Sequence, residues 1–257
     1  MDRINDGKSI SSMISSNVLN PSQRAYQMEY CFKKASIFLP YIPVIEYATF
    51  DAMQGNWICA YLSLLPVVEA LIREWAKEVP TLTFGKMKGF GKTLSDYLKN
   101  TLNVFEDERI ELVNGYLTHL KYTLCEVLYI DFDTYEDAGF AEIFNRNLTL
   151  HKLDGVINVK SGLNNVVRTL LLIDIIAELY LMQNPKRWWE ITLAASPEND
   201  LDFQLRWQLY IKRSMLAIGP DDLLIIQNAL SGEATDEKKI STIKALKAEI
   251  AFIKRLK

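Results

Sequence analysis

The segment Leu163–Met182 constrains the fold more than any other part of the sequence. It is apolar on almost every side, but it also contains Arg168, Asp174 and Glu178. Ionisable side chains at these positions argue against a membrane span, because charges are costly inside a bilayer. A helix that is apolar all round is typical of the buried centre of a protein. We therefore expect a long central helix here, with other elements packed around it.

Apolar residues recur at helical spacing through much of the remaining chain. The clearest long helix covers Asn56–Val79, which has one apolar stripe. The other predicted helices are one that begins at Pro21 with Ser22 as its cap, then Ile45–Met53, Lys92–Leu102, Asp107–Tyr129, and further helices after Pro185. Strands do not alternate with helices, and 8 Pro and 11 Gly are too few for a turn-rich β-sandwich. The sequence predicts an all-α fold: a helical bundle with a helical carboxy-terminal extension.

The positions of polar and helix-breaking residues predict three units along the chain. Residues 1–20 are rich in Ser, Asn and Asp, and we expect a flexible lead-in. Residues 21–185 form the predicted helical domain, within which Lys152–Gly162 is expected to be irregular. Residues 186–257 are predicted to be a helical extension packed on or following the core.

Charge and cysteine content limit the classes of function. The net charge of −3 gives no global attraction to nucleic acid, so any contact with RNA would need a local basic patch. The first residues lack an apolar stretch of signal-peptide length. Cys31, Cys59 and Cys125 are odd in number and far apart, which is typical of reduced thiols. We expect a cytoplasmic protein without membrane attachment, metal or other cofactor.

The string GKMKGFGKT, from Gly85 to Thr93, is similar to a phosphate-binding P-loop. That motif has four residues between its first Gly and the Gly-Lys pair, whereas Gly85 and Gly91 are separated by five. No parallel sheet is predicted to hold the loop, which argues against an ATPase. Two simpler interpretations stay open: a basic loop that contacts RNA phosphates, or a solvated charged loop. The lysines concerned are Lys86, Lys88 and Lys92.

Histidine is scarce, since the chain has only His119 and His151. His151 ends the string FNRNLTLH, in which it follows Arg146 and Asn147. This string lies between a polar loop and the predicted central helix. If the string is helical, Arg146 and His151 are little more than one turn apart and could face one cleft. His119 lies at the edge of its predicted helix, and we interpret it as structural.

The same string is similar to the recurrent motif of the HEPN family of helical nucleotide-binding and ribonuclease domains. That motif is an Arg, a polar residue, and a His after four to six intervening positions, which Arg146, Asn147 and His151 match. The resemblance covers roughly residues 45–185. It implies metal-independent RNA cleavage by a homodimer acting as a toxin or phage-defence effector, with a possible antitoxin or regulatory partner. Many relatives carry Gly after the His, where this chain has Lys152, which could bind RNA instead.

The residue types suit the implied reaction. A neutral imidazole can take a proton from a ribose 2′-hydroxyl near pH 7, and an imidazolium can donate one to the leaving oxygen. His151 is therefore assigned as general base or acid, Arg146 as stabiliser of phosphoryl charge, and Asn147 as an orienting or phosphate-holding group. The alternative is a non-catalytic helical module that binds RNA, nucleotide or a partner, in which His151 merely packs.

Two carboxylates fall inside apolar stripes of predicted helices, namely Glu69 and Asp174. A buried carboxylate is costly without a cation or hydrogen-bond donor, so each should have a partner. One hypothesis is that both orient Arg146 and His151. The alternative is a Glu69–Arg73 pair one helical turn apart, with Asp174 bound by a neighbouring helix.

The last predicted helix is amphipathic and basic. Its apolar stripe consists of Ile240, Ile243, Leu246, Ile250 and Ile253. Lysines predominate between Asp236 and Lys257. Such a helix can meet RNA phosphates, a membrane surface or a partner's groove. The plainer interpretation is a terminal helix docked on the core with a solvated lysine face.

Overall fold

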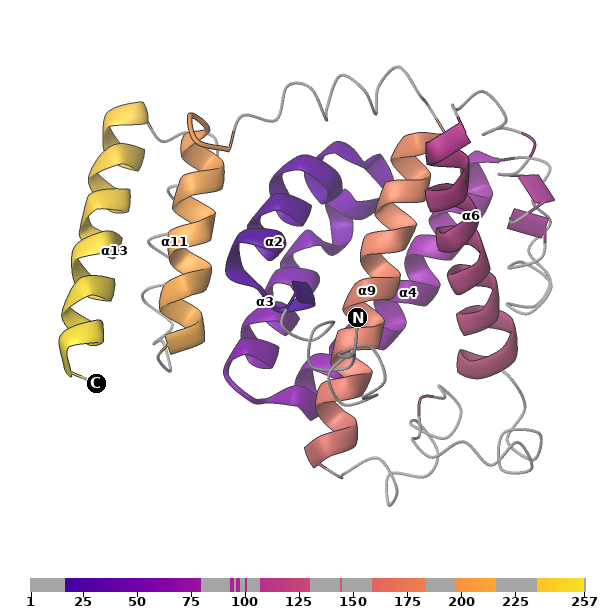
Figure 1. Ribbon diagram of the computed structural model, residues 1–257, viewed down its shortest axis with the longest axis horizontal. Coiled ribbons are helices and arrows are strands. Elements are labelled where there is room, and N and C mark those ends of the chain that lie inside the picture. The colour runs from indigo at the N-terminus through magenta and orange to yellow at the C-terminus, as the bar shows by residue number, and fades with distance from the viewer. Residues whose placement is uncertain are drawn as a thin grey trace.

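The computed structural model describes residues 17–79, 93–94, 96–97, 100, 107–129, 144, 159–183, 197–215 and 235–256. The elements in chain order are α2 (Pro21–Tyr26), η1 (Gln27–Cys31), η2 (Phe32–Lys34), η3 (Ser36–Tyr41), α3 (Ile42–Met53), α4 (Trp57–Glu78), α6 (Asp107–Tyr122), η4 (Thr123–Leu128), α9 (Val159–Met182), α11 (Leu201–Met215) and α13 (Asp236–Leu256). Within these described ranges every regular element is helical and none is a strand (Figure 1). The predicted all-α fold is confirmed for this part of the chain.

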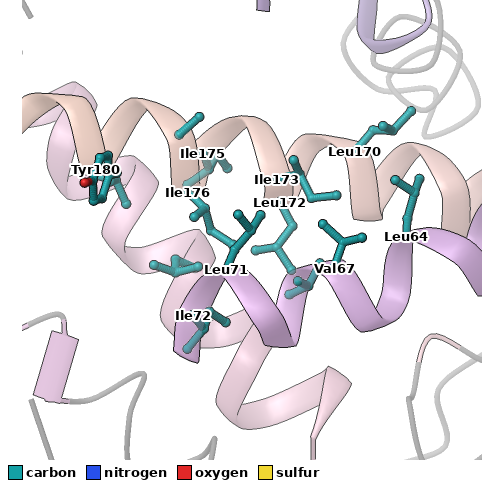
Figure 2. Packing of buried hydrophobic residues seen from close by; sticks show 14 of the residues in the cluster. Leu64, Val67, Leu71, Ile72, Leu170, Leu172, Ile173, Ile175, Ile176 and Tyr180 are labelled. Atoms are coloured by element: carbon teal, nitrogen blue, oxygen red, sulfur yellow. The ribbon is translucent and has the colours of Figure 1, made fainter. Parts of the chain in front are cut away.

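Helices α4 and α9 form the centre of the main hydrophobic core. Figure 2 shows their apolar side chains meeting between the two ribbons, among them Leu64, Leu71, Ile173 and Ile176. All four are fully buried. The two long helices predicted from the sequence are therefore confirmed, because each is buried against the other.

The two central helices run in the same direction. Leu64 of α4 and Leu170 of α9 are both found at the same end of the drawn part of the pair (Figure 2). Near the other end, the rings of Trp75 and Tyr180 meet edge to face with centroids 5.7 Å apart. Since residue numbers rise together along both helices, the chain leaves α4 at one end of the pair and enters α9 at the other.

The boundaries of the first helices follow from local capping. The side chain of Asn20 accepts a hydrogen bond of 2.9 Å from the backbone N–H of Ser22, and Pro21 occupies the first turn. The prediction of Ser22 as the cap was wrong, because Asn caps a helix as well as Ser does and the proline suits the position after it. Helix α3 begins at Ile42, before the predicted start, since Pro43 also fits a first helical turn.

The later boundaries differ from prediction at one place. The predicted helix Asp107–Tyr129 is present as α6 followed by the π-helical turn η4. Helix α9 begins at Val159, so the expectation that Lys152–Gly162 is irregular was wrong for its last residues. Residues 93, 94, 96, 97 and 100 of the predicted helix Lys92–Leu102 are helical. Residues 1–16 of the predicted lead-in lie outside the described residues.

The carboxy-terminal helices extend the molecule sideways from the α4–α9 pair. Helix α11 packs on α2 and α3, and α13 packs on the opposite side of α11 (Figure 1). Phe203 and Tyr210 of α11 share a second hydrophobic cluster with Tyr30 and Phe50. Leu205, Ile243 and Leu246 form a third cluster, between α11 and α13. Among the helices that the structure describes, none is long and apolar enough to cross a membrane.

Candidate functional site

Phe144 fixes the position at which the Arg–His string begins. Its side chain is 3% exposed, and its ring centroid lies 6.1 Å from that of Tyr61 in α4. The guanidinium carbon of Arg168 in α9 lies 5.7 Å from the centroid of the same ring, a cation–π distance. Phe144 therefore ties the residue just before Asn145 to the amino-terminal halves of both central helices.

The predicted site residues of the string itself lie outside the described residues. They are Arg146, Asn147, His151 and Lys152. The loop lysines Lys86, Lys88 and Lys92 lie outside them as well. The catalytic and RNA-binding roles assigned to these residues stay predictions.

Glu69 lies on α4 and is partly buried. Its carboxylate accepts hydrogen bonds from Nε and Nη2 of Arg73, at 3.1 and 2.6 Å. Arg73 is half exposed, so this is a surface pair one helical turn apart. The predicted pair of Glu69 with Arg73, one helical turn away, is thus confirmed. An additional role in orienting His151 or Arg146 stays a prediction.

Asp174 lies in the interior, where α9 meets α2. Both of its carboxylate oxygens accept from the guanidinium of Arg24, one of them at 2.9 Å. Burial raises the pKa of the Asp174 carboxyl, and Arg24 opposes that rise. The neighbouring-helix partner predicted for Asp174 is therefore present, and it is an arginine that the sequence reasoning did not single out. A role of Asp174 toward the Arg–His string stays a prediction.

Acidic and phenolic groups surround this ion pair. The Cys31 thiol donates a hydrogen bond of 3.4 Å to Glu178, and burial raises the pKa of that thiol well above its usual value. Burial and nearby negative charge also raise the pKa values of Tyr26 and Tyr116 to about 12. These groups are protonated near neutral pH, so they suit a structural cluster better than nucleophilic chemistry.

His119 is the one histidine on a described element. It is half buried on α6, and burial lowers the pKa of its imidazole from 6.5. His119 is therefore mainly neutral at pH 7, which agrees with its interpretation as a structural residue. It is a matched control for experiments on His151.

A second set of buried charges joins α11 to the amino-terminal helices. Arg206, which is 2% exposed, donates to the carboxylates of Glu29 and Glu46. Lys33 also binds Glu29 at 2.6 Å, and the Tyr210 hydroxyl donates to Glu46 at 3.3 Å. Each carboxylate thus has two donors, and the cluster fixes α11 on the surface formed by η1 and α3.

The sequence held a signal for both buried arginines. Arg24 shares a helical face with Met28, four residues on, and Arg206 shares one with Leu209 and Tyr210. An arginine at a position that helical spacing turns toward the core must have an acidic partner. Glu69 and Asp174 were identified because each is a charged residue inside the apolar stripe of a predicted helix. The same criterion identifies Arg24 and Arg206.

No group of three or more metal-ligating side chains occurs among the residues that the structure describes. Comparison of the chain with protein-family models, with curated proteins and with solved structures found no match.

Proposed function

We propose that this chain is a metal-independent endoribonuclease of HEPN type, with its site at the string Asn145-Arg146-Asn147-Leu148-Thr149-Leu150-His151. The observation that carries the proposal is the anchoring of Phe144, directly before this string, against Tyr61 of α4 and Arg168 of α9. The string thereby follows a fixed point on the two most deeply buried helices. Catalysis needs such a rigid support, because misplacement of a group by about 1 Å can cost on the order of 10²-fold in rate.

The reaction needs one group to accept a proton and another to donate one. In the proposal, His151 takes the proton of the ribose 2′-hydroxyl, and the 2′-oxygen attacks the adjacent phosphorus. The bond from phosphorus to the 5′-oxygen breaks, which leaves a 2′,3′-cyclic phosphate and a 5′-hydroxyl. Arg146 balances the charge that builds on the phosphoryl oxygens, and Asn147 orients the imidazole or holds the phosphate.

A second imidazole is required for the second proton transfer. His119 does not suit this role, since it is half buried and its pKa is lowered. Two copies of the chain that face each other would bring two His151 side chains to one scissile phosphate. The proposal therefore includes a homodimer, as the HEPN resemblance implies. The accompanying biological role, a toxin or phage-defence effector restrained by a partner, rests on that resemblance as well.

The first prediction tests the two central residues. Wild-type protein, Arg146→Ala and His151→Ala are incubated with RNA in EDTA, and product is followed by gel electrophoresis. Loss of general acid–base catalysis should lower the rate of the His151 variant by about 10²–10⁴-fold. Loss of the guanidinium should lower the rate of the Arg146 variant by about 10²–10³-fold.

The matched control is His119→Ala, which removes the same side chain from α6 and should keep the wild-type rate. RNA with a 2′-deoxyribose at the cut position should resist cleavage in every case, because it lacks the nucleophile. Undiminished cleavage by His151→Ala, or inhibition of the wild type by EDTA, would contradict the proposal. RNA binding without cleavage by the wild type would support the non-catalytic module instead.

A further inference from the structure

Helix α13 uses one face and a few charges to dock on α11. Ile243, Leu246 and Ile250 are buried on that face. Two ion pairs flank them: Lys239 with Asp202 at 2.7 Å, and Glu249 with Lys212 at 2.5 Å. Helix α13 therefore docks on α11, whereas the sequence predicted docking on the core.

A second face of α13 forms what we call the α13 ridge, made of Ile240, Lys244, Lys247, Ala251 and Arg255. These residues follow one another at three- and four-residue spacing, so they share one side of the helix, and all five are exposed. Lys244, Lys247 and Arg255 make no ion pair with any residue that the structure describes. The ridge itself contains no carboxylate.

The acids of α13 lie in its first turn or on another face, and Asp236, four residues before Ile240, continues the line of the ridge into that turn. Asp236 and Glu237 are in its first turn, where the helix dipole favours negative charge. Glu249 lies on another face and is paired with Lys212. Within the part of the chain that the structure describes, no ion pair compensates Lys244, Lys247 or Arg255, although the net charge of the chain is −3. Because the protein as a whole is acidic, this strip of positive charge stands out from the rest of its surface, as expected of a site that binds an anionic partner.

The length and chemistry of the ridge suit a chain of phosphates. At 1.5 Å per residue, the ridge extends about 16 Å from Lys244 to Arg255. A nucleic-acid strand carries one charged phosphate per nucleotide, so a strip of this length can meet several successive phosphates. A bilayer fits less well, because Ile243, Leu246 and Ile250 are buried against α11, and Ile240 is the single bulky apolar residue of the ridge. A protein partner also fits less well, since protein interfaces are poor in lysine and rely on aromatic anchors.

We propose that the α13 ridge binds the phosphodiester backbone of RNA without reading its sequence. This inference rests on the proposed function, since it assigns to the RNA substrate a second contact that is separate from the cleavage site. The ridge contributes affinity and leaves the chemical step to the Arg–His string. Its contacts are electrostatic, so they weaken with salt.

The second prediction measures the salt dependence of RNA binding. The probe is a fluorescein-labelled single-stranded RNA of mixed sequence, and the full chain carries His151→Ala so that the probe stays intact. In that background the ridge variant is Lys244→Gln, Lys247→Gln and Arg255→Gln, and Kd is measured by anisotropy over a range of salt. Each phosphate contact contributes about 0.7 to the slope of log Kd against log salt for single strands, so three lost contacts should make the slope shallower by about 2.

The matched control variant is Arg73→Gln, Lys77→Gln and Lys121→Gln, which removes the same number of exposed lysines and arginines from α4 and α6. It should leave the slope unchanged. A charge-conserving variant, Lys244→Arg, Lys247→Arg and Arg255→Lys, should also keep it. Equal slopes for the ridge variant and its parent, equal losses in the ridge and control variants, or no RNA binding at all would overturn the inference. Ridge-dependent binding to polyglutamate or to anionic phosphatidylserine vesicles in place of RNA would overturn it too.

Measurements of RNA cleavage and of RNA binding test the ribonuclease proposal and the α13 ridge proposal separately. In the His151 wild-type background, the ridge variant should raise KM and leave kcat unchanged. A protein that shows ridge-dependent RNA binding without cleavage retains this inference and loses the ribonuclease proposal. A protein that cleaves RNA while the ridge variant binds it normally retains the proposal and loses this inference.

Discussion

Arg24 and Asp174 bring opposite charges into the interior at the junction of α2 and α9. Transfer of two charges out of water is expensive, and their mutual attraction repays that cost only when the geometry is good. Here the guanidinium contacts both carboxylate oxygens. Burial still raises the pKa of Asp174, which means that desolvation outweighs the attraction of Arg24. The pair therefore specifies how α2 meets α9 more than it adds stability.

The third prediction concerns the removal of one partner. Arg24→Met should lower the free energy of unfolding by about 3–5 kcal/mol at pH 7, because the Asp174 carboxylate is left buried and alone. The loss should depend on pH. Without Arg24 the pKa of Asp174 rises further, so the folded state binds its proton more tightly than the unfolded state does. Stability is then highest below the unfolded pKa of about 3.9 and falls as pH rises through the folded value.

Urea unfolding followed by circular dichroism at pH 4.5 and pH 7.5 measures this effect. The double variant with Arg24→Met and Asp174→Asn should show no such pH dependence, since position 174 then has no group that titrates. Arg73→Met, which breaks the exposed pair with Glu69, should cost less than about 1 kcal/mol. A single variant that loses the same free energy at both pH values would contradict the assignment.

At the scale of elements, α11 is attached to the rest of the molecule differently from α4 and α9. The central helices meet through the large apolar cluster, whereas α11 is fixed by a small aromatic cluster and by Arg206 between two carboxylates. Helix α13 in turn packs mainly on α11. The two helices form a peripheral unit that is attached through a small aromatic cluster and a few charged contacts.

The fourth prediction is that Arg206→Met loosens this unit selectively. The substitution leaves Glu29 and Glu46 without their shared guanidinium, at a cost of about 3–5 kcal/mol. Amide hydrogen exchange measured by mass spectrometry should speed up in α11 and α13 and stay slow in α4 and α9. Lys33→Gln, at the half-exposed edge of the same cluster, is the control and should change exchange little. Faster exchange throughout the chain would show that α11 belongs to the central cooperative unit.

How much the sequence could predict varied with the kind of signal. Long apolar stripes predicted α4 and α9 well, because helical periodicity reports burial directly. The start of α9 at Val159 and the cap at Asn20 were mispredicted, since neighbouring residues can serve equally well at a helix end. The partner of Asp174 could not be identified, because Arg24 is distant in sequence and its pairing depends on how α2 packs against α9. The Arg–His string was found from its spacing alone, and Phe144, whose burial anchors it, gave no signal of its own.

At the scale of the whole molecule, stability is concentrated where α4 and α9 meet. Leu71 is fully buried between them, beside Ile176 (Figure 2). Leu71 belongs to the main hydrophobic cluster, whose large buried residues come from several elements and include Trp75, Phe32 and Phe38. Close packing of this kind leaves little room for the surroundings to relax when a side chain is shortened.

The fifth prediction follows from that packing. Leu71→Ala should lower the free energy of unfolding by about 2–5 kcal/mol, through lost burial and an unfilled cavity. Ile240→Ala, which shortens an exposed side chain on α13, should change it by less than about 0.5 kcal/mol. Chemical denaturation of both variants at one pH makes the comparison. A loss below 1 kcal/mol for Leu71→Ala would show that this contact is not central to the fold.

The shared direction of α4 and α9 has a consequence for how the protein is made. The ribosome finishes α4 long before it reaches Met182, at the far end of α9. Helix α3 is made earlier and packs on α4, but the side of α4 that faces α9 has no permanent neighbour until then. Pairing across so long a stretch of chain is slow compared with the formation of local turns. The nascent polypeptide therefore exposes, throughout that interval, the apolar side of α4 that α9 covers in the folded protein. A chaperone that binds apolar helices should bind the chain between the synthesis of Glu78 and that of Met182.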